Sequence, residues 1–526
     1  MKFPSSLGLF TGLLAYTEIH YRFPWFPISR YYQREPEIIV DVPYRVDPGK
    51  PIPIFLLIKD AHIFPIALET FQIMIECPSG RIETIEKRYN EVISTRWYWG
   101  ATEFQPSESG VHRITGTVSF RRGNTTRTVV NHNVKTSPGT ALSTWVDDSP
   151  LPGSAVFCWG DLHYHSSYTE DYVEFGAPLP MTVKAAAACG LDFLAVTDHS
   201  YDLDDKPGSW SETDPDLRKW KRSRFEIQSL NESGSFRLIP AEEVTVRNGR
   251  GKNIHFLIYR YADFIPGSGD GAEDWFKTRS EYDIADIIAK TGDSILKIAA
   301  HPRVSVSWLE KLLINRGYWE DADLNHDGLD GLQILNGSID RHFESGLSCW
   351  RRQLLNGKKR FIYAGNDAHG NFNLFHQIRI PMLTTAMHRE QILGQCRNGV
   401  PRESSHSLTE LLIHLKQGRS IITNGPALQL TVNERYFTGE SIVTDKADVA
   451  LWGESSPLFG NIAHVRLFRG DLNRQEEKMI KEWGTDALQM KAGIIIDING
   501  PIYLRAEIWT VNGQAGFTNP LWISQK

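Results

Sequence analysis

The sequence predicts an α/β protein with a β/α barrel in the middle of the chain and a mainly antiparallel β-sandwich domain on either side. In the centre, five apolar, strand-like runs end in residue types that bind metals, and helical patterns separate the runs. A β/α barrel builds its site in this way, at the C-terminal ends of its strands. On both flanks, short alternating apolar and polar runs with polar turns are typical of antiparallel sandwiches.

The first central run, 155–159, leads into Asp161-Leu-His163-Tyr-His165. Side chains two residues apart on extended backbone project to the same side, so His163 and His165 can reach one metal ion. A short His-x-His sequence is by itself weak evidence for a metal site.

Similar residues stand beside the other central runs, and their recurrence makes the pattern informative. Four runs end at Asp198-His199, Glu242-Glu243, His301 and Asp367-Ala-His369, and His255 opens a further apolar run. Ligand types at so many strand ends predict a metal site.

These motifs resemble those of the polymerase and histidinol phosphatase (PHP) family. The resemblance rests on Gly160-Asp-Leu-His-Tyr-His, Val196-Thr-Asp-His, Pro240-Ala-Glu-Glu-Val-Thr, Ala299-Ala-His-Pro and Gly365-Asn-Asp-Ala-His, in the family's order. It covers about the central half of the chain and looks closest to the carbaryl-hydrolase-like branch. It implies a distorted seven-stranded (β/α) PHP barrel that holds two or three divalent ions.

The resemblance also implies an assignment of ligands to ions. The first ion would be held by His163, His165, Glu243 and Asp367. Glu243 would bridge to a second ion on His255 and His301, and a third would use His199 and His369 with Glu170 or Asp171. The chain departs from the family here, because Thr169-Glu170-Asp171-Tyr172 replaces the usual Ser-Asp-Gly. Adjacent side chains on a strand face opposite ways, so only one of Glu242 and Glu243 can be a ligand; Glu243 aligns with the family position and Glu242 is the alternative.

The donor types predict the chemistry. Imidazole and carboxylate without thiolate suit zinc, manganese or iron. Such ions activate a bridging hydroxide and stabilise charge in hydrolysis. Asp198 or a histidine of the ligand shell, His199, is the candidate proton shuttle; the alternative role of Asp198 is to orient an imidazole.

The substrate is predicted to be a small ester, and the resemblance implies a phosphoester, as in most of the family. Arg303, two residues after His301, is the candidate phosphate-binding residue, with a solvated loop arginine as the alternative. The end of a short nucleic acid is also considered, because 218–224 holds five basic residues. The chain has 57 Lys+Arg against 63 Asp+Glu and a net charge of -6, which argues against avid nucleic-acid binding. Carbamate, carboxylic ester or amide hydrolysis and a non-catalytic metal-binding scaffold are the alternative functions.

The predicted organisation is an aromatic-rich segment 1–36, a β-sandwich at 37–146, the barrel at 154–405, and a helix plus a second sandwich at 406–526. Five scattered cysteines argue for a reducing compartment, so a cytoplasmic location is favoured over a secreted or membrane-peripheral one. The apolar stretch 7–16 is too short to span a bilayer, so no transmembrane segment is expected. The sequence does not predict the oligomeric state.

Overall fold

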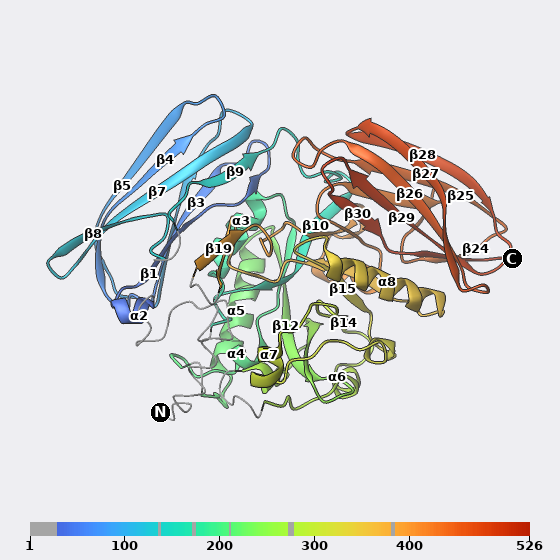
Figure 1. Ribbon diagram of the computed structural model, residues 1–526, viewed down its shortest axis with the longest axis horizontal. Coiled ribbons are helices and arrows are strands. Elements are labelled where there is room, and N and C mark those ends of the chain that lie inside the picture. The colour runs from blue at the N-terminus through green and yellow to red at the C-terminus, as the bar shows by residue number, and fades with distance from the viewer. Residues whose placement is uncertain (1–28, 135–137, 171–174, 210–211, 272–277, 380–383) are drawn as a thin grey trace.

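The computed structural model describes the chain apart from residues 1–28, 135–137, 171–174, 210–211, 272–277 and 380–383. Most of the predicted N-terminal segment and Asp171 therefore lie outside the described residues. Figure 1 shows two strand-rich lobes, blue and red, above a central part that contains helices α3, α5 and α8.

The N-terminal lobe consists of two sheets. Its elements are α2 (Arg30–Gln33), β1 (Glu37–Asp41), β2 (Arg45–Val46), β3 (Ile52–Lys59), β4 (Ile66–Glu76), β5 (Ile82–Ile93), β6 (Trp97–Phe104), β7 (Gly110–Arg122), β8 (Thr125–Val130) and β9 (Leu142–Val146). One sheet has the order β1-β3-β6; the other has β2-β9-β7-β4-β5, with β8 beside β7. Alternating residues such as Phe71, Ile73 and Ile75 of β4 are buried in the apolar core of this lobe, as the period of a strand requires.

The central part contains strands that neighbour one another in chain order. These are β10 (Phe157–His165), β11 (Phe193–Val196), β12 (Arg237–Arg247), β13 (Asn253–Tyr259), β14 (Leu296–Ala299), β15 (Gly331–Asn336) and β16 (Phe361–Gly365). Between them lie α3 (Leu179–Ala188), α4 (Ser200–Leu203), α5 (Arg218–Ser233), η1 (Ser268–Asp270), α6 (Ile284–Thr291), α7 (Trp308–Leu313), η3 (Asp323–Asn325) and α8 (Arg341–Leu355). These strands are buried along nearly their whole length, and outside the candidate site most of their residues are apolar, as expected of strands covered on both faces.

The predicted fold, a distorted seven-stranded (β/α) barrel flanked by two mainly antiparallel β-sandwich domains, is wrong. The chain is 44% strand and 17% helix. The central strands belong to a 16-stranded mixed sheet that continues through β20 (Arg397–Pro401) and β21 (Ile421–Thr423) into the C-terminal lobe. Moreover, β13 is antiparallel to both β12 and β14, and a tight turn at 248–252 joins β12 directly to β13. An apolar run identifies a buried strand but fixes neither its direction nor its partners.

The C-terminal lobe packs a four-stranded sheet, β23-β22-β25-β28, against the end of the large sheet. Its elements are α9 (Leu408–Lys416), β22 (Ala427–Val432), β23 (Tyr436–Phe437), β24 (Ser441–Val443), β25 (Lys446–Glu454), β26 (Ile462–Asp471), β27 (Glu476–Ala487), β28 (Gln489–Asp497), β29 (Ile502–Thr510), β30 (Ala515–Thr518) and β31 (Leu521–Ser524). Three short segments precede β20: β17 (Ala368–His369), β18 (Phe375–Arg379) and β19 (Thr384–His388).

Two features bear on the predicted location. All five cysteines are buried and none forms a disulfide. Among the described residues, no helix combines the length and the apolar character needed to cross a membrane. The compartment itself stays a prediction.

Candidate metal centre

Strand β10 brings His163 and His165 to one point in the interior, where both are fully buried. The Nδ1–H of His163 donates to Oε1 of Gln333, 2.8 Å away. The Nδ1–H of His165 donates to Oγ1 of Thr169 at 3.2 Å, because the hydroxyl proton of Thr169 is used on Asp198. These partners occupy the Nδ1 atoms, so the Nε2 atom of each imidazole is the one directed into the site.

The two Nε2 atoms face one another. Nε2 of His163 and Nε2 of His165 are 3.1 Å apart, and Oδ1 of Asp367 lies 3.2 Å and 3.1 Å from them. Three electron-rich atoms at such distances repel one another unless a cation or a proton lies between them. Ligand atoms about 2.1 Å from one ion lie roughly 3.0–3.4 Å from each other, so the residues fit a divalent metal ion.

Glu243 of β12 is the centre of the cluster and is fully buried. Its Oε1 lies 2.7 Å from His255 Nδ1, 3.2 Å from His301 Nε2 and 3.4 Å from His163 Nε2. Its Oε2 lies 3.0 Å from His199 Nδ1 and 3.5 Å from His165 Nε2. One carboxylate therefore joins five imidazoles, the arrangement expected of a ligand shared between ions.

The charges of the cluster shift its pKa values strongly. Burial alone would raise the pKa of Glu243, but the imidazoles of His255 and His163 hold it well below its usual range. Burial lowers the pKa of His163, yet Glu243 and Asp367 outweigh burial and raise it to about 9. Burial and the neighbouring His369 and His199 lower the pKa of His165 well below its usual value.

Two of the ligand-type residues sit on strained backbone. His301 and Asp367 have φ angles of 27° and 52°, in the left-handed region that residues other than glycine rarely adopt. Gly365, just before Asp367, has no space for a side chain, because an added Cβ would lie 2.4 Å from Cβ of His163. Strain of this kind is concentrated at functional sites, where the rest of the fold holds it.

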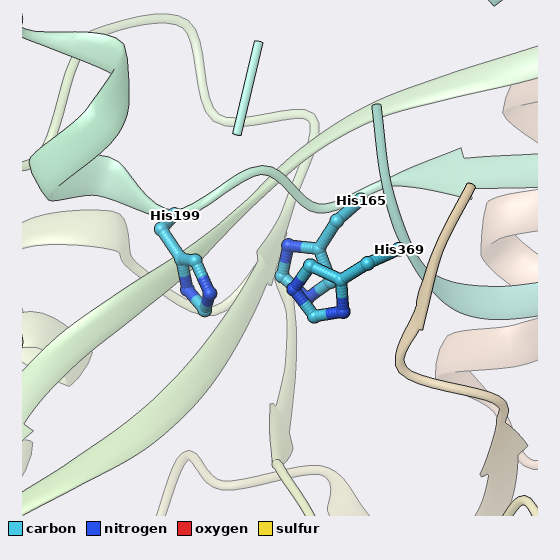
Figure 2. Close-up of side chains that lie close together, drawn as sticks. All are labelled: His165, His199 and His369. Carbon is cyan, nitrogen blue, oxygen red and sulfur yellow. The ribbon is translucent and has the colours of Figure 1, made fainter. Parts of the chain in front are cut away.

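A second group, shown in Figure 2, is formed by His165, His199 and His369, whose nitrogens lie within 4.8 Å of one another. The ring of His165 stacks on His369 at a centroid distance of 4.1 Å and lies 4.3 Å from His199. Nδ1–H of His369 donates to the carbonyl oxygen of Asp367 at 3.1 Å, so Nε2 would be its metal-binding atom. Two further groups, His163-His165-Glu243-Asp367 and His199-Glu243-His255, share residues with this one.

Asp198 is buried and binds the loop that follows β10. Its carboxylate accepts hydrogen bonds from the backbone N–H and hydroxyl of both Ser166 and Thr169, at 2.7–3.2 Å. With these four donors and an exposed fraction of 1%, Asp198 orients the loop that carries Thr169. The geometry favours the orienting role over the proton shuttle, and His199 stays the candidate shuttle.

Two residues around His255, Asp270 and Arg316, carry no signal in the sequence that would mark them as part of the site. Nε2 of His255 lies 2.8 Å from Oδ2 of Asp270, and the guanidinium of Arg316 contacts both Asp270 and the imidazole. A carboxylate behind a ligand histidine fixes the ring and increases its basicity. Asp270 belongs to a glycine-rich segment, 267–271, that looks like a loop in the sequence, and only its burial beside His255 gives it a role.

The substitution Asp270→Asn is expected to weaken divalent metal binding by about 10- to 100-fold, because His255 loses its charged partner. Competition with a chromophoric chelator measures this affinity. Asp286→Asn is the matched control, since Asp286 is half exposed in the capping box of α6. Equal affinities in both variants would contradict the role of Asp270.

Other predicted residues lie outside the cluster. Glu170 is not in any of the three groups and pairs instead with Lys59 and Arg96. Glu242 faces away from Glu243 and binds Trp220 Nε1 and Arg224 at 2.7 Å and 2.6 Å. The acid of the third ion is therefore not identified among the described residues.

The two candidate sites for phosphate and nucleic acid are engaged within the protein. Arg303 donates to the carbonyl oxygen of Trp319 at 3.1 Å and to Cys349 Sγ at 2.9 Å, and it pairs with Asp321. The basic segment lies on α5, where Arg218, Lys219 and Arg224 pair with Asp214, Asp205 and Glu242. Neither observation supports the predicted role in binding a substrate.

No protein-family model and no curated protein matches the chain. Among solved structures, it aligns with β-glucuronidases of Bacteroides uniformis (10% identity, TM-score 0.18) and Parabacteroides merdae (8% identity, TM-score 0.19) over 93% of its length. The chain spans only 60% and 64% of those two proteins. A putative β-galactosidase of Bacteroides fragilis aligns at 8% identity over 93% of this chain and 73% of its own length, with a TM-score of 0.16. TM-scores this low do not indicate a shared fold.

Proposed function

We propose that this protein is a metal-dependent hydrolase of the PHP type that cleaves a small phosphoester. The observation that supports the proposal is the position of Glu243, whose two buried oxygens lie within 3.5 Å of nitrogens from five histidines. A structural metal site would need only four ligands around one ion. Overlapping groups that share Glu243 and His165 are better explained by two or three neighbouring ions.

The donor set indicates which ions fit. Nitrogen and oxygen ligands without sulfur suit zinc, manganese or iron. When bound, such ions lower the pKa of a shared water towards neutrality and stabilise charge on the attacking and leaving oxygens. The chain's own residues supply the rest: Gln333 and Thr169 fix the imidazoles of His163 and His165, and the buried strands keep bulk water away from Glu243.

Arg316 supports an anionic substrate. It lines a cavity of about 50 Å³ together with His255 and His301, two residues of the cluster. Its guanidinium pairs with Asp270 and contacts His255, and the N–H donors that these contacts leave over are suited to a phosphate oxygen. The small volume favours a small ester over a polymer that must enter the cavity.

Apolar side chains beside the same cavity favour a second candidate, the hydrolysis of carboxylic or carbamic esters. Val304 and Tyr318 line it and are 38% and 39% exposed, and Trp308 of the adjacent α7 is 70% exposed. Exposed apolar groups near a site are typical of surfaces that bind ligands. They would accept the apolar part of a carboxylic or carbamic ester.

The test begins with metal analysis of protein purified without chelators. Metal-free protein is then reconstituted with zinc, manganese or iron(II) and assayed on phosphomonoesters, phosphodiesters, naphthyl carboxylic esters and carbamates. Phosphate release that depends on the metal is the expected result. Turnover of carboxylic esters alone would establish the second candidate, bound metal without turnover would indicate a scaffold, and failure to bind any of these metals would refute the proposal.

A further inference from the structure

The N-terminal lobe places a buried charge against the loop that follows the first metal motif. Nζ of Lys59, at the end of β3, lies 3.0 Å from Oε1 of Glu170, and the two side chains are 1% and 3% exposed. Arg96 binds the other oxygen of Glu170 at 2.7 Å. The ammonium of Lys59 also lies 4.8 Å from the ring centroid of Phe175, on the same loop. Such an ion pair is costly to bury and strongly unfavourable to break, so it fixes the two parts to one another.

The same lobe also holds the loop that follows the last metal motif. Oδ2 of Asp41, at the end of β1, accepts a hydrogen bond from the backbone N–H of Phe372 at 3.0 Å. The N–H of Tyr44 donates to the carbonyl oxygen of Phe372 at 2.8 Å, and the ring of Phe372 lies 5.5 Å from that of Phe55. Phe372 is thus held by its backbone and its side chain.

Each of these contacts is a few residues from a histidine of the group in Figure 2. Glu170 follows Thr169, whose hydroxyl fixes the ring of His165. Phe372 lies three residues after His369, whose ring stacks on His165. The loops that follow His165 and His369 are about 200 residues apart in the sequence, and both contact the N-terminal lobe.

We propose that the N-terminal lobe is a positioning element of the metal centre, which holds the loops of His165 and His369 in register through Lys59 and Asp41. The effect of the lobe on metal binding rests on the proposed function. Its mechanical role, which is to hold the two loops in place, does not. Lys59 and Asp41 are positioning residues and contact no substrate. The lobe therefore does more than extend the fold: it completes the geometry of the group formed by His165, His199 and His369.

The experiment compares Lys59→Met and Asp41→Asn with the rescue variant Lys59→Arg, all in the full chain. Glu477→Gln is the matched control, because Glu477 is equally buried in an ion pair with Arg505 but lies in the C-terminal lobe. Hydrogen exchange of peptides covering 162–170 and 366–374 is measured without metal. Cobalt(II) binding is followed by its visible absorption, which reports the number and geometry of its ligands.

In Lys59→Met, the amides of peptide 162–170 are expected to exchange at least about tenfold faster than in the wild type. In Asp41→Asn, the amides of peptide 366–374 are expected to show the same increase. Cobalt is expected to bind about 10- to 100-fold more weakly to the histidine group in both variants, and Lys59→Arg should recover part of the loss. Unchanged exchange in both peptides, or the same change in Glu477→Gln, would overturn the mechanical role. Faster exchange with unaltered cobalt spectra and affinity would overturn the link to the metal centre. If the wild type binds no metal, the proposed function fails, and the exchange comparison alone still decides whether the lobe holds the loops.

Discussion

Replacing Glu243 with glutamine is expected to lower hydrolysis by at least about a thousandfold, because charge stabilisation by metal ions contributes several kcal/mol to catalysis. The amide keeps the size of the side chain but removes the charge that faces five imidazoles. The variant should also bind fewer ions per chain than the wild type. Steady-state kinetics and metal analysis of the same preparation measure both effects.

Glu242→Gln is the matched control, one residue away on the same strand. Glu242 is as deeply buried as Glu243, but its partners are Trp220 and Arg224. We expect this variant to lose stability, since it breaks a buried ion pair, while it retains the metal content and activity of the wild type. If Glu242→Gln lost its metal and Glu243→Gln kept it, the assignment of the bridging ligand would be reversed.

Removal of metal by a chelator is expected to lower the free energy of unfolding by about 4 kcal/mol, relative to protein held at free metal about a thousandfold above Kd. Binding should also release protons at pH 7. Without metal, Glu243 and Asp367 raise the pKa of His163 to about 9 in spite of its burial, so an ion must displace the proton of His163. Metal affinity should therefore increase with pH up to about 9.

The same shift predicts how the stability of the metal-free protein changes with pH. The folded-state pKa of His163 lies above its ordinary value of 6.5, so its contribution to stability is fully present below pH 6.5 and is lost as the pH rises through about 9. Calorimetry in buffers of different ionisation enthalpy counts the released protons, and denaturant titrations between pH 6 and 9 follow the stability. His163→Gln should abolish the proton release. A substitution of His414, whose imidazole binds the carbonyl oxygen of Ser404, should leave the proton release unchanged. Equal release in both variants would contradict the assignment to His163.

Much of the candidate centre was predictable from the sequence because ligand type and strand ends are local properties. His163 and His165 needed only the alternation of a strand, and Glu243 followed from its position in a motif. Residues such as Gln333, Asp270 and Arg316 could not be found in this way. Each is a common polar residue in an ordinary run, and its role arises from contact with a histidine 15 to 170 residues away in the sequence.

The fold was predicted less well, and His255 shows why. It opens its apolar run, whereas the other ligand types close theirs. If all ligands lie at one edge of the sheet, a ligand at the start of a strand requires that strand to run in the opposite direction, and β13 is indeed antiparallel to both neighbours. This signal was present in the sequence and pointed away from a regular β/α barrel.

By itself, the sequence determined which residues supply the candidate donor atoms and that they flank buried strands. Hydrophobic periodicity and residue chemistry are written in short segments, and they need no knowledge of the partner strands. Only the tertiary structure decided that the central strands join the C-terminal lobe in one mixed sheet, that Glu170 serves an ion pair with Lys59, and that Arg303 is engaged elsewhere. These features depend on contacts between segments that are far apart in the sequence, and local sequence patterns do not show which of these segments meet.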